Sequence, residues 1–307
     1  MLPEYVVRKD LEAVVRTVYW IKDEKSLAIA MRKLNVMGPD YFFRGLSRSS
    51  YRLYTSAQRF WDDSPASFPK NGNMDTYWMP SLHAIRTTGD HAFEQRLKDL
   101  GLERDDDIAW LSYMQHHQEH TPFLDFTEDP FIALCFAAKE PGSKKGRSVP
   151  LDNWFCLYAL PRKVIHQFNR EFARAIEKHR PRTDLIAGRV YSKYMFFSEG
   201  KFLLMHQPWL AEHLGAEYGR IMNNVFIERQ KGLFLFHRFP EHPFTEALLL
   251  YQQQENMTRD NSILVSDQII CMNIHRSLAS SVRARLMQLN PPLHWDYIMP
   301  SDDQIIS

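Results

Sequence analysis

The sequence predicts one mixed α+β domain with an N-terminal helical extension. Three observations support this fold class. Segments with helical spacing of apolar residues alternate with short aromatic strands, no linker or repeat divides the chain, and 307 residues suffice for one large domain. The hydrophobic fraction of 44% and the charged fraction of 24% are ordinary globular values. They exclude whole-chain disorder, a collagen-like repeat and a coiled coil.

Charge and cysteine content narrow the class of protein. Lys and Arg total 38 and Asp and Glu total 37, so no global basic field indicates nucleic acid or an anionic membrane surface. The three cysteines, Cys135, Cys156 and Cys271, lie far apart in apolar surroundings, which favours a reducing compartment and hence the cytoplasm. No run of about 18 apolar residues lacks a charge, and residues 1–25 lack the apolar segment of a secretory signal. We therefore expect no membrane partner.

The first third of the chain begins with helical periodicity. Apolar residues recur at helical spacing from Leu11 to Leu34, which predicts two amphipathic helices within an extension over residues 1–37. A turn signal at residues 38–40 then opens the domain over residues 38–307. The next segment, Tyr41–Gly45, predicts a short aromatic strand.

The middle of the chain predicts helices on both sides of a strand-like segment. Helical patterns cover Asp90–Gly101 and Asp106–His117, and residues 121–129 interrupt them. A buried helix follows at Pro130–Ala138, and either Thr127 or Asp129 is placed to cap it.

The later part of the chain predicts two more strands, a hairpin or bulged strand, and two helical segments. The strands are Trp154–Leu160 and Ile263–Ile274, the hairpin or bulged strand is Asn224–Phe236, and the helical segments are Arg162–Arg180 and Leu278–Leu289.

Common catalytic motifs are absent from the sequence. His116 and His120 would share a helix face, but His117 stands where a zincin has its glutamate, so we expect no metal and keep metal-assisted hydrolysis as the weakest alternative. The chain has no P-loop, no Gly-x-Gly-x-x-Gly segment and no Gly-x-Ser-x-Gly elbow. The usual nucleotide folds and the serine hydrolases are therefore unsupported.

Three segments place polar groups beside apolar ones. Arg44 ends an aromatic strand with a planar donor fork that suits phosphate or carboxylate, or else a structural ion pair with Asp125. Thr127 precedes the apolar helix, which is otherwise an ordinary capped core helix. Glu228 and Gln230 would share one face of a strand, where they either reach a common ligand or remain solvated.

In this order, the three segments resemble the FRG domain family. Phe43-Arg44-Gly45 matches the motif that names the family, and residues 115–127 (QHHQEHTPFLDFT) resemble its second hallmark without a gap. Gln230, Gly232 and Phe234 partly match a third element. The sequence departs from the pattern at Gln118, His120, Phe126 and Phe226, where the family has glycine, proline, tryptophan and arginine.

The same order more distantly resembles the ADP-ribosyltransferases of the Arg-Ser-Glu class. This resemblance implies a mixed split β-sheet core with helices packed around it, and NAD or a related nucleotide as substrate rather than a cofactor. It implies that Arg44 holds a phosphate or ribose oxygen, that Thr127 orients the nicotinamide side, and that Glu228 or Gln230 faces the ribose hydroxyl. Residues expected to contact the substrate with Arg44 are Gly45, His116, Asp125 and Phe126.

The resemblance allows two functions. One is an intracellular enzyme that transfers ADP-ribose or hydrolyses NAD, in which a carboxylate stabilises the positive charge that develops at the ribose carbon. Because the amide of Gln230 can only hydrogen-bond, Glu228 would supply that charge. The alternative is a non-catalytic module of the same fold that binds a nucleotide or a protein.

Overall fold

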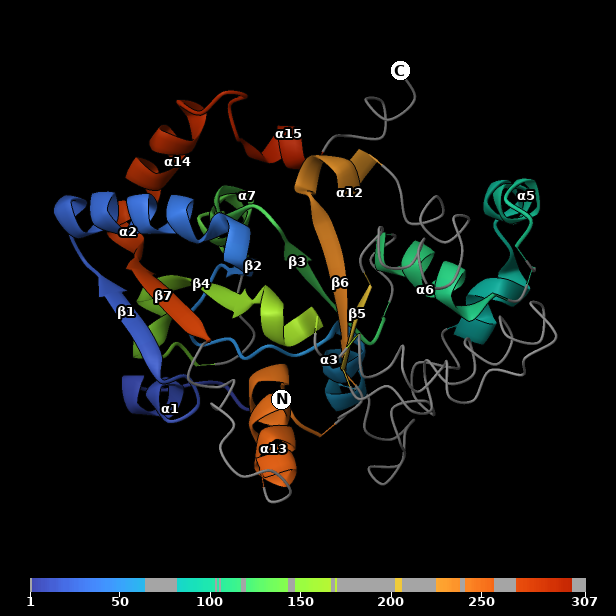
Figure 1. The fold of residues 1–307 in the computed structure, drawn as a ribbon, viewed down its shortest axis with the longest axis horizontal. Helices are drawn as coiled ribbons and strands as arrows, with labels where there is room; N and C mark the ends of the chain where they lie inside the picture. The colour runs from blue at the N-terminus through green and yellow to red at the C-terminus, as the bar shows by residue number, and fades with distance from the viewer. Residues whose placement is uncertain are drawn as a thin grey trace.

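The described strands form one seven-stranded mixed sheet with helices packed on it. The structure, a computed structural model, describes residues 2–63, 82–102, 104, 106–116, 120–142, 147–166, 169, 202–205, 225–237, 241–256 and 269–299. The strand order is β1-β7-β4-β2-β3-β6-β5 (Figure 1). The α+β class predicted from the sequence is confirmed.

The elements have the following bounds. The strands are β1 Thr17–Ile21, β2 Tyr41–Leu46, β3 Phe123–Thr127, β4 Trp154–Pro161, β5 Phe202–Met205, β6 Gly232–His237 and β7 Ile270–His275. The helices are α1 Arg8–Glu12, α2 Glu24–Met37, α3 Ser56–Asp63, α5 His91–Asp99, α6 Asp107–His116, α7 Pro130–Ala137, α12 Val225–Gln230, α13 Phe244–Asn256, α14 Ala279–Met287 and α15 Trp295–Ile298. Short 3-10 turns lie at Gly38–Asp40, Pro150–Asn153 and Arg276–Leu278.

The sheet is split between β2 and β3. Strand β2 pairs with β4 from Tyr41 to Leu46, and β3 pairs with β6 along its whole length, both antiparallel. By contrast, β2 and β3 share a single register pair, Phe43 with Thr127. A four-stranded part (β1-β7-β4-β2) and a three-stranded part (β3-β6-β5) therefore meet at one pair of residues.

Each face of the four-stranded part has its own hydrophobic core. Leu34 of α2, Ile132 of α7 and Val282 of α14 pack with Phe43 on one face. Leu11 of α1 and Leu248 of α13 belong to the core around Phe42 on the other face. Figure 1 shows α2, α7 and α14 above the strands and α1 and α13 below them. Because side chains alternate along a strand, neighbouring residues of β2 serve different cores.

Gly45 allows helix α7 to approach β2 closely. A Cβ atom at this position would lie 1.9 Å from the carbonyl oxygen of Ala133 and 2.8 Å from the amide nitrogen of Ala137. Both are backbone atoms of α7, so no side-chain rotation would relieve the overlap. The helix is fixed at its start by Asp129, whose side chain accepts a 2.9 Å hydrogen bond from the amide of Phe131. Of the two expected capping residues, Asp129 is the cap.

Two predicted elements are wrong in type. Residues 17–21 form strand β1 rather than the first of two long helices, because their β-branched and aromatic side chains suit a strand that pairs in parallel with β7. The N-terminal 37 residues thus add a strand to the sheet and are not only helical. Residues 225–230 form helix α12 rather than a strand. This helix ends at Lys231, whose φ of 45° turns the chain into β6.

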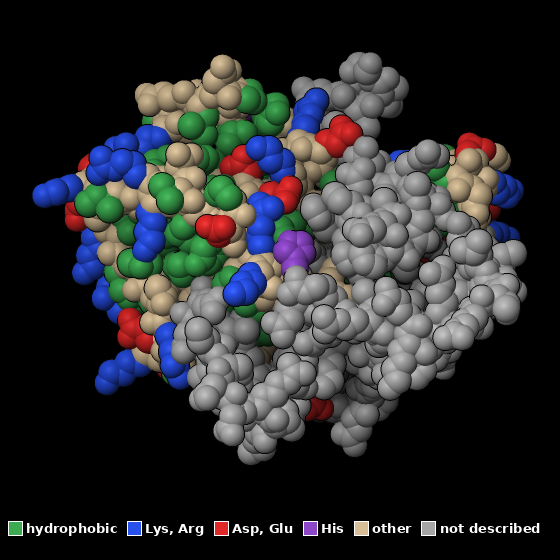
Figure 2. Space-filling model, viewed as in Figure 1, with side chains coloured by type: hydrophobic (Ala, Val, Ile, Leu, Met, Phe, Trp, Pro, Cys, Tyr) green, Lys and Arg blue, Asp and Glu red, His purple; other side chains and the backbone are tan. Residues whose placement is uncertain are grey.

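Other expected elements fall partly outside the described residues. The helical sequence after Arg162 is described as helical over residues 162–166, and most of its remainder lies outside. The strand expected from Ile263 is described from Ile270 onward. No helix of the described part is long and apolar enough to cross a membrane. On the face shown in Figure 2, basic and acidic side chains are interspersed over the described elements.

We predict that Gly45→Ala lowers the free energy of unfolding by about 3 kcal/mol or more, because the added methyl group overlaps the backbone of α7. Urea denaturation of the variant and the parent protein measures this. Gly142→Ala is the matched control, since a Cβ atom there would meet nothing within 4 Å. Equal stability of the Gly45 variant would contradict the close packing of α7 on β2.

We predict that the native protein reacts slowly with a thiol reagent. All three cysteines are buried and free, and burial raises the pKa of Cys135 to about 11. The thiol is therefore protonated at neutral pH, and the thiolate is the reactive form. Labelling should become fast only on addition of denaturant. Rapid labelling of Cys135 in buffer, located by mass spectrometry, would contradict its position inside α7.

Candidate functional site

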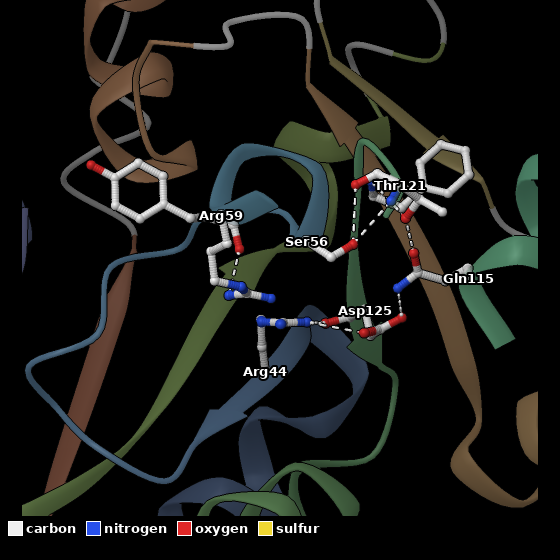
Figure 3. A network of polar contacts seen from close by, with 8 residues as sticks. Arg44, Ser56, Arg59, Gln115, Thr121 and Asp125 are labelled. Carbon is white, nitrogen blue, oxygen red and sulfur yellow. Dashed lines mark hydrogen bonds and ion pairs between the residues drawn. The ribbon is translucent and has the colours of Figure 1, made fainter. Parts of the chain in front are cut away.

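Arg44 occupies the split between β2 and β3. It follows the buried Phe43, and its Nη1 donates a hydrogen bond to the backbone carbonyl of Asp125 on β3 (Figure 3). The same nitrogen lies 3.6 Å from Asp125 Oδ2. The Arg44 side chain is 14% exposed and that of Asp125 is 54% exposed. The structure therefore brings these two predicted site residues together, as the ion-pair interpretation expected.

A second arginine lies beside Arg44. Arg59 comes from α3, and Figure 3 shows its guanidinium beside that of Arg44. Its Nη1 donates a 2.9 Å hydrogen bond to the carbonyl of Tyr54, and its side chain keeps exposed surface. No carboxylate of the described residues forms an ion pair with Arg59. The Nε of Arg44 is likewise buried without a hydrogen-bond partner among these residues.

The surroundings of the two arginines lower the pKa of both guanidiniums. Burial lowers the pKa of Arg44, and the nearby Asp125 offsets part of this effect. Desolvation by the surrounding protein is the larger cause that lowers the pKa of Arg59 to about 10, and the positive charge of Arg44 contributes to the same shift. Both groups still carry a full charge at pH 7.

Asp125 is held in place by a chain of hydrogen bonds. Gln115, near the end of α6, donates a 2.6 Å hydrogen bond from Nε2 to Asp125 Oδ1, and its Oε1 accepts one from the hydroxyl of Thr121. The amide of Thr121 donates to Ser56 Oγ at 3.0 Å, at the start of α3. The network thus links α6, β3 and α3, the helix that carries Arg59.

Thr127 hydrogen-bonds to backbone groups at the end of β3. It pairs directly with Phe43, the residue before Arg44, so the two strands meet one residue from the arginine. The Thr127 hydroxyl donates to the carbonyl of Gln230 at 2.6 Å and accepts from the amide of Asp129 at 3.0 Å. The described contacts of the Thr127 side chain are thus with backbone groups at Gln230 and Asp129, and a cleft that it shares with Arg44 stays a prediction.

Glu228 and Gln230 belong to helix α12. Because the segment is helical, the two side chains do not share the face that a strand would give them. The Gln230 amide donates a 3.0 Å hydrogen bond to the carbonyl of Ile298 beside α15, and Glu228 is exposed. The described contacts of Gln230 are thus with the C-terminal part of the chain and with Thr127.

The other expected contact residues have structural roles or lack a described side chain. Phe126 is 4% exposed and packs edge-on to Phe244 in the core, and Gly45 packs under α7. His116 ends α6, and its side chain lies outside the described residues. His120 stacks on Phe60 at 4.0 Å between ring centroids. No group of three potential metal ligands gathers within the described part of the chain.

The sequence analysis missed Arg59 as a site residue. A single arginine in a short polar helix has no spacing signal, and its role depends on where α3 lies against the split. Gln115 was visible as the first residue of the second family motif, but the sequence alone assigned it no contact with Asp125.

The fold and the site define an α+β protein with a split sheet that presents two facing arginines beside one carboxylate. Residues 39–146 match the family model described as FRG domain, so the resemblance to this family that the sequence predicted is confirmed over these residues. The match includes Arg44, Arg59, Gln115 and Asp125, whereas Glu228 and Gln230 lie beyond it. Comparison with the curated proteins and with the solved structures gave no match.

We predict that Thr127→Val lowers the free energy of unfolding by about 1–2 kcal/mol, because it removes the donor to Gln230 and leaves the amide of Asp129 unpaired. Thermal and urea unfolding measure this loss. The affinity for NAD or ADP-ribose should stay unchanged, since the described hydrogen bonds of the Thr127 hydroxyl go to backbone groups. A fully stable variant that loses nucleotide affinity would instead support the role that the ADP-ribosyltransferase resemblance gives to Thr127.

Proposed function

We propose that the chain binds a phosphate-bearing nucleotide, NAD or a relative of it, at the split between β2 and β3. The observation that carries this proposal is the Arg44 guanidinium, which is largely buried in the split with an unpartnered Nε. A guanidinium presents planar pairs of donors that match phosphate oxygens. A buried donor without a partner is costly, and a ligand oxygen would supply that partner.

The contact of Arg44 with Asp125 is weak enough for such a ligand to replace it. At 3.6 Å, the Arg44 Nη1 and the Asp125 Oδ2 are too far apart for a good hydrogen bond, and the carboxylate is half exposed. A pair of this kind contributes little to stability compared with a fully buried pair. An anion from solvent can therefore displace the carboxylate from Arg44 at low cost.

Transfer of ADP-ribose or hydrolysis of NAD is the second candidate function. The observation that favours it is Asp125 itself, a half-exposed carboxylate that Gln115 orients beside the arginine. A carboxylate so placed can stabilise positive charge at a ribose carbon. Glu228 and Gln230 stay candidates only through the family resemblance. Release of nicotinamide from NAD that Asp125→Asn abolishes would establish that the protein is an enzyme. Binding of NAD without release of nicotinamide would establish a non-catalytic binding module.

The buried, free cysteines also fit a protein of a reducing compartment such as the cytoplasm.

We predict that Arg44→Lys lowers the affinity for ADP-ribose at least about tenfold, because an ammonium cannot form the paired hydrogen bonds of a guanidinium. Calorimetric titration of NAD and ADP-ribose into both proteins measures this, and melting temperatures confirm that the variant folds. Arg32→Lys, on the exposed side of α2, is the matched control. Unchanged affinity in a folded Arg44→Ala protein would contradict a nucleotide site at Arg44.

A further inference from the structure

We infer that Arg44 and Arg59 form a two-arginine clamp on one phosphate group, so that the nucleotide is recognised through its phosphate rather than through its base or ribose. This inference rests on the proposed function and names the chemistry that selects its ligand. Figure 3 shows the two guanidiniums facing each other, one from β2 and the other from α3.

Among the described residues, the charges around the split leave a positive surplus. Arg44 and Arg59 carry two positive charges, and Asp125 carries the negative charge that lies against Arg44. Two neighbouring guanidiniums repel each other, and the repulsion is strong where protein replaces water. A bound anion between them would turn this repulsion into two attractions. The lowered pKa of Arg59, to which Arg44 contributes, agrees with such a strained pair.

The described contacts also leave hydrogen-bond donors free. A guanidinium has five N–H donors. The described hydrogen bonds engage Arg59 through Nη1, with the carbonyl of Tyr54, and Arg44 through Nη1, with the carbonyl of Asp125. These two backbone bonds fix the direction of each side chain while other N–H groups remain for a ligand. The site is therefore ordered before the ligand arrives, which lowers the entropic cost of binding.

A phosphate suits this arrangement better than a carboxylate does. Each phosphate of NAD or ADP-ribose carries two non-bridging oxygens in a tetrahedral arrangement, so two guanidiniums can approach it from different directions. The two oxygens of a carboxylate lie in one plane and suit one guanidinium. Arg59 and Asp125 both carry exposed surface, so a phosphate in solution can reach the pair. When the phosphate replaces Asp125 Oδ2 at Arg44, Asp125 keeps its hydrogen bond from Gln115 through Oδ1.

The test uses Arg59→Gln in the full chain, with inorganic phosphate, ADP-ribose and adenosine as probes. Chloride at equal ionic strength corrects for screening. We expect phosphate to raise the melting temperature of the parent protein. Arg59→Gln should bind phosphate and ADP-ribose at least about tenfold more weakly, while its melting temperature without ligand is unchanged or higher, because the repulsion with Arg44 is gone. Adenosine, which lacks phosphate, should bind weakly to both proteins.

Arg32→Gln is the matched control, since it removes one positive charge from an exposed position on α2. It should leave all three affinities unchanged. Binding of phosphate by the parent protein and not by Arg59→Gln, with no binding of NAD or ADP-ribose by either, would support the clamp and overturn the proposed function.

Two results would overturn the clamp. In the first, Arg59→Gln binds ADP-ribose as tightly as the parent protein, whereas Arg44→Lys binds it more weakly. The nucleotide site would then depend on Arg44 and not on Arg59. In the second, phosphate has no effect on the parent protein and adenosine binds as tightly as ADP-ribose.

Discussion

The single register pair between β2 and β3 is the constraint on which the rest of the structure depends. Because Phe43 meets Thr127 and the two strands share no further pair, the sheet opens directly beside Arg44. The close contact of α7 with Gly45 holds β2 on one side of this opening. The pairing of β3 with β6 holds Asp125 on the other. The Phe-Arg-Gly motif thus supplies a core residue, a charged group and a packing contact in three consecutive positions.

The charge in the split is positioned from outside the sheet. Arg59 reaches the split from α3, and Gln115 orients Asp125 from α6. Two helices that are far apart in the sequence therefore fix the positions of the charged groups in the split. The contact of Ser56 with Thr121 joins the helix that carries Arg59 to the segment that leads into β3. A shift of α3 would therefore move Arg59 and disturb the support of Asp125 together. This coupling favours a site that is rigid before it binds.

The sequence predicted what depends on local pattern and missed what depends on tertiary placement. The aromatic strand that carries Arg44, the capped apolar helix α7 and the contact of Arg44 with Asp125 follow from residue types and motif order. The helix at residues 225–230 was taken for a strand because a short apolar run suits both. The contacts of Thr127 with the backbone at Gln230 and Asp129 depend on how β3 meets α12 and α7, which cannot be deduced from a segment alone.

A crystal structure of the chain with ADP-ribose bound tests the central claim most directly. The account predicts that oxygens of one phosphate lie within hydrogen-bond distance of both the Arg44 and the Arg59 guanidiniums, and that Asp125 remains bonded to Gln115. The backbone pairing of Phe43 with Thr127 should be unchanged. Density for the nucleotide at another place, with the two arginines still facing each other and no phosphate between them, would contradict the account.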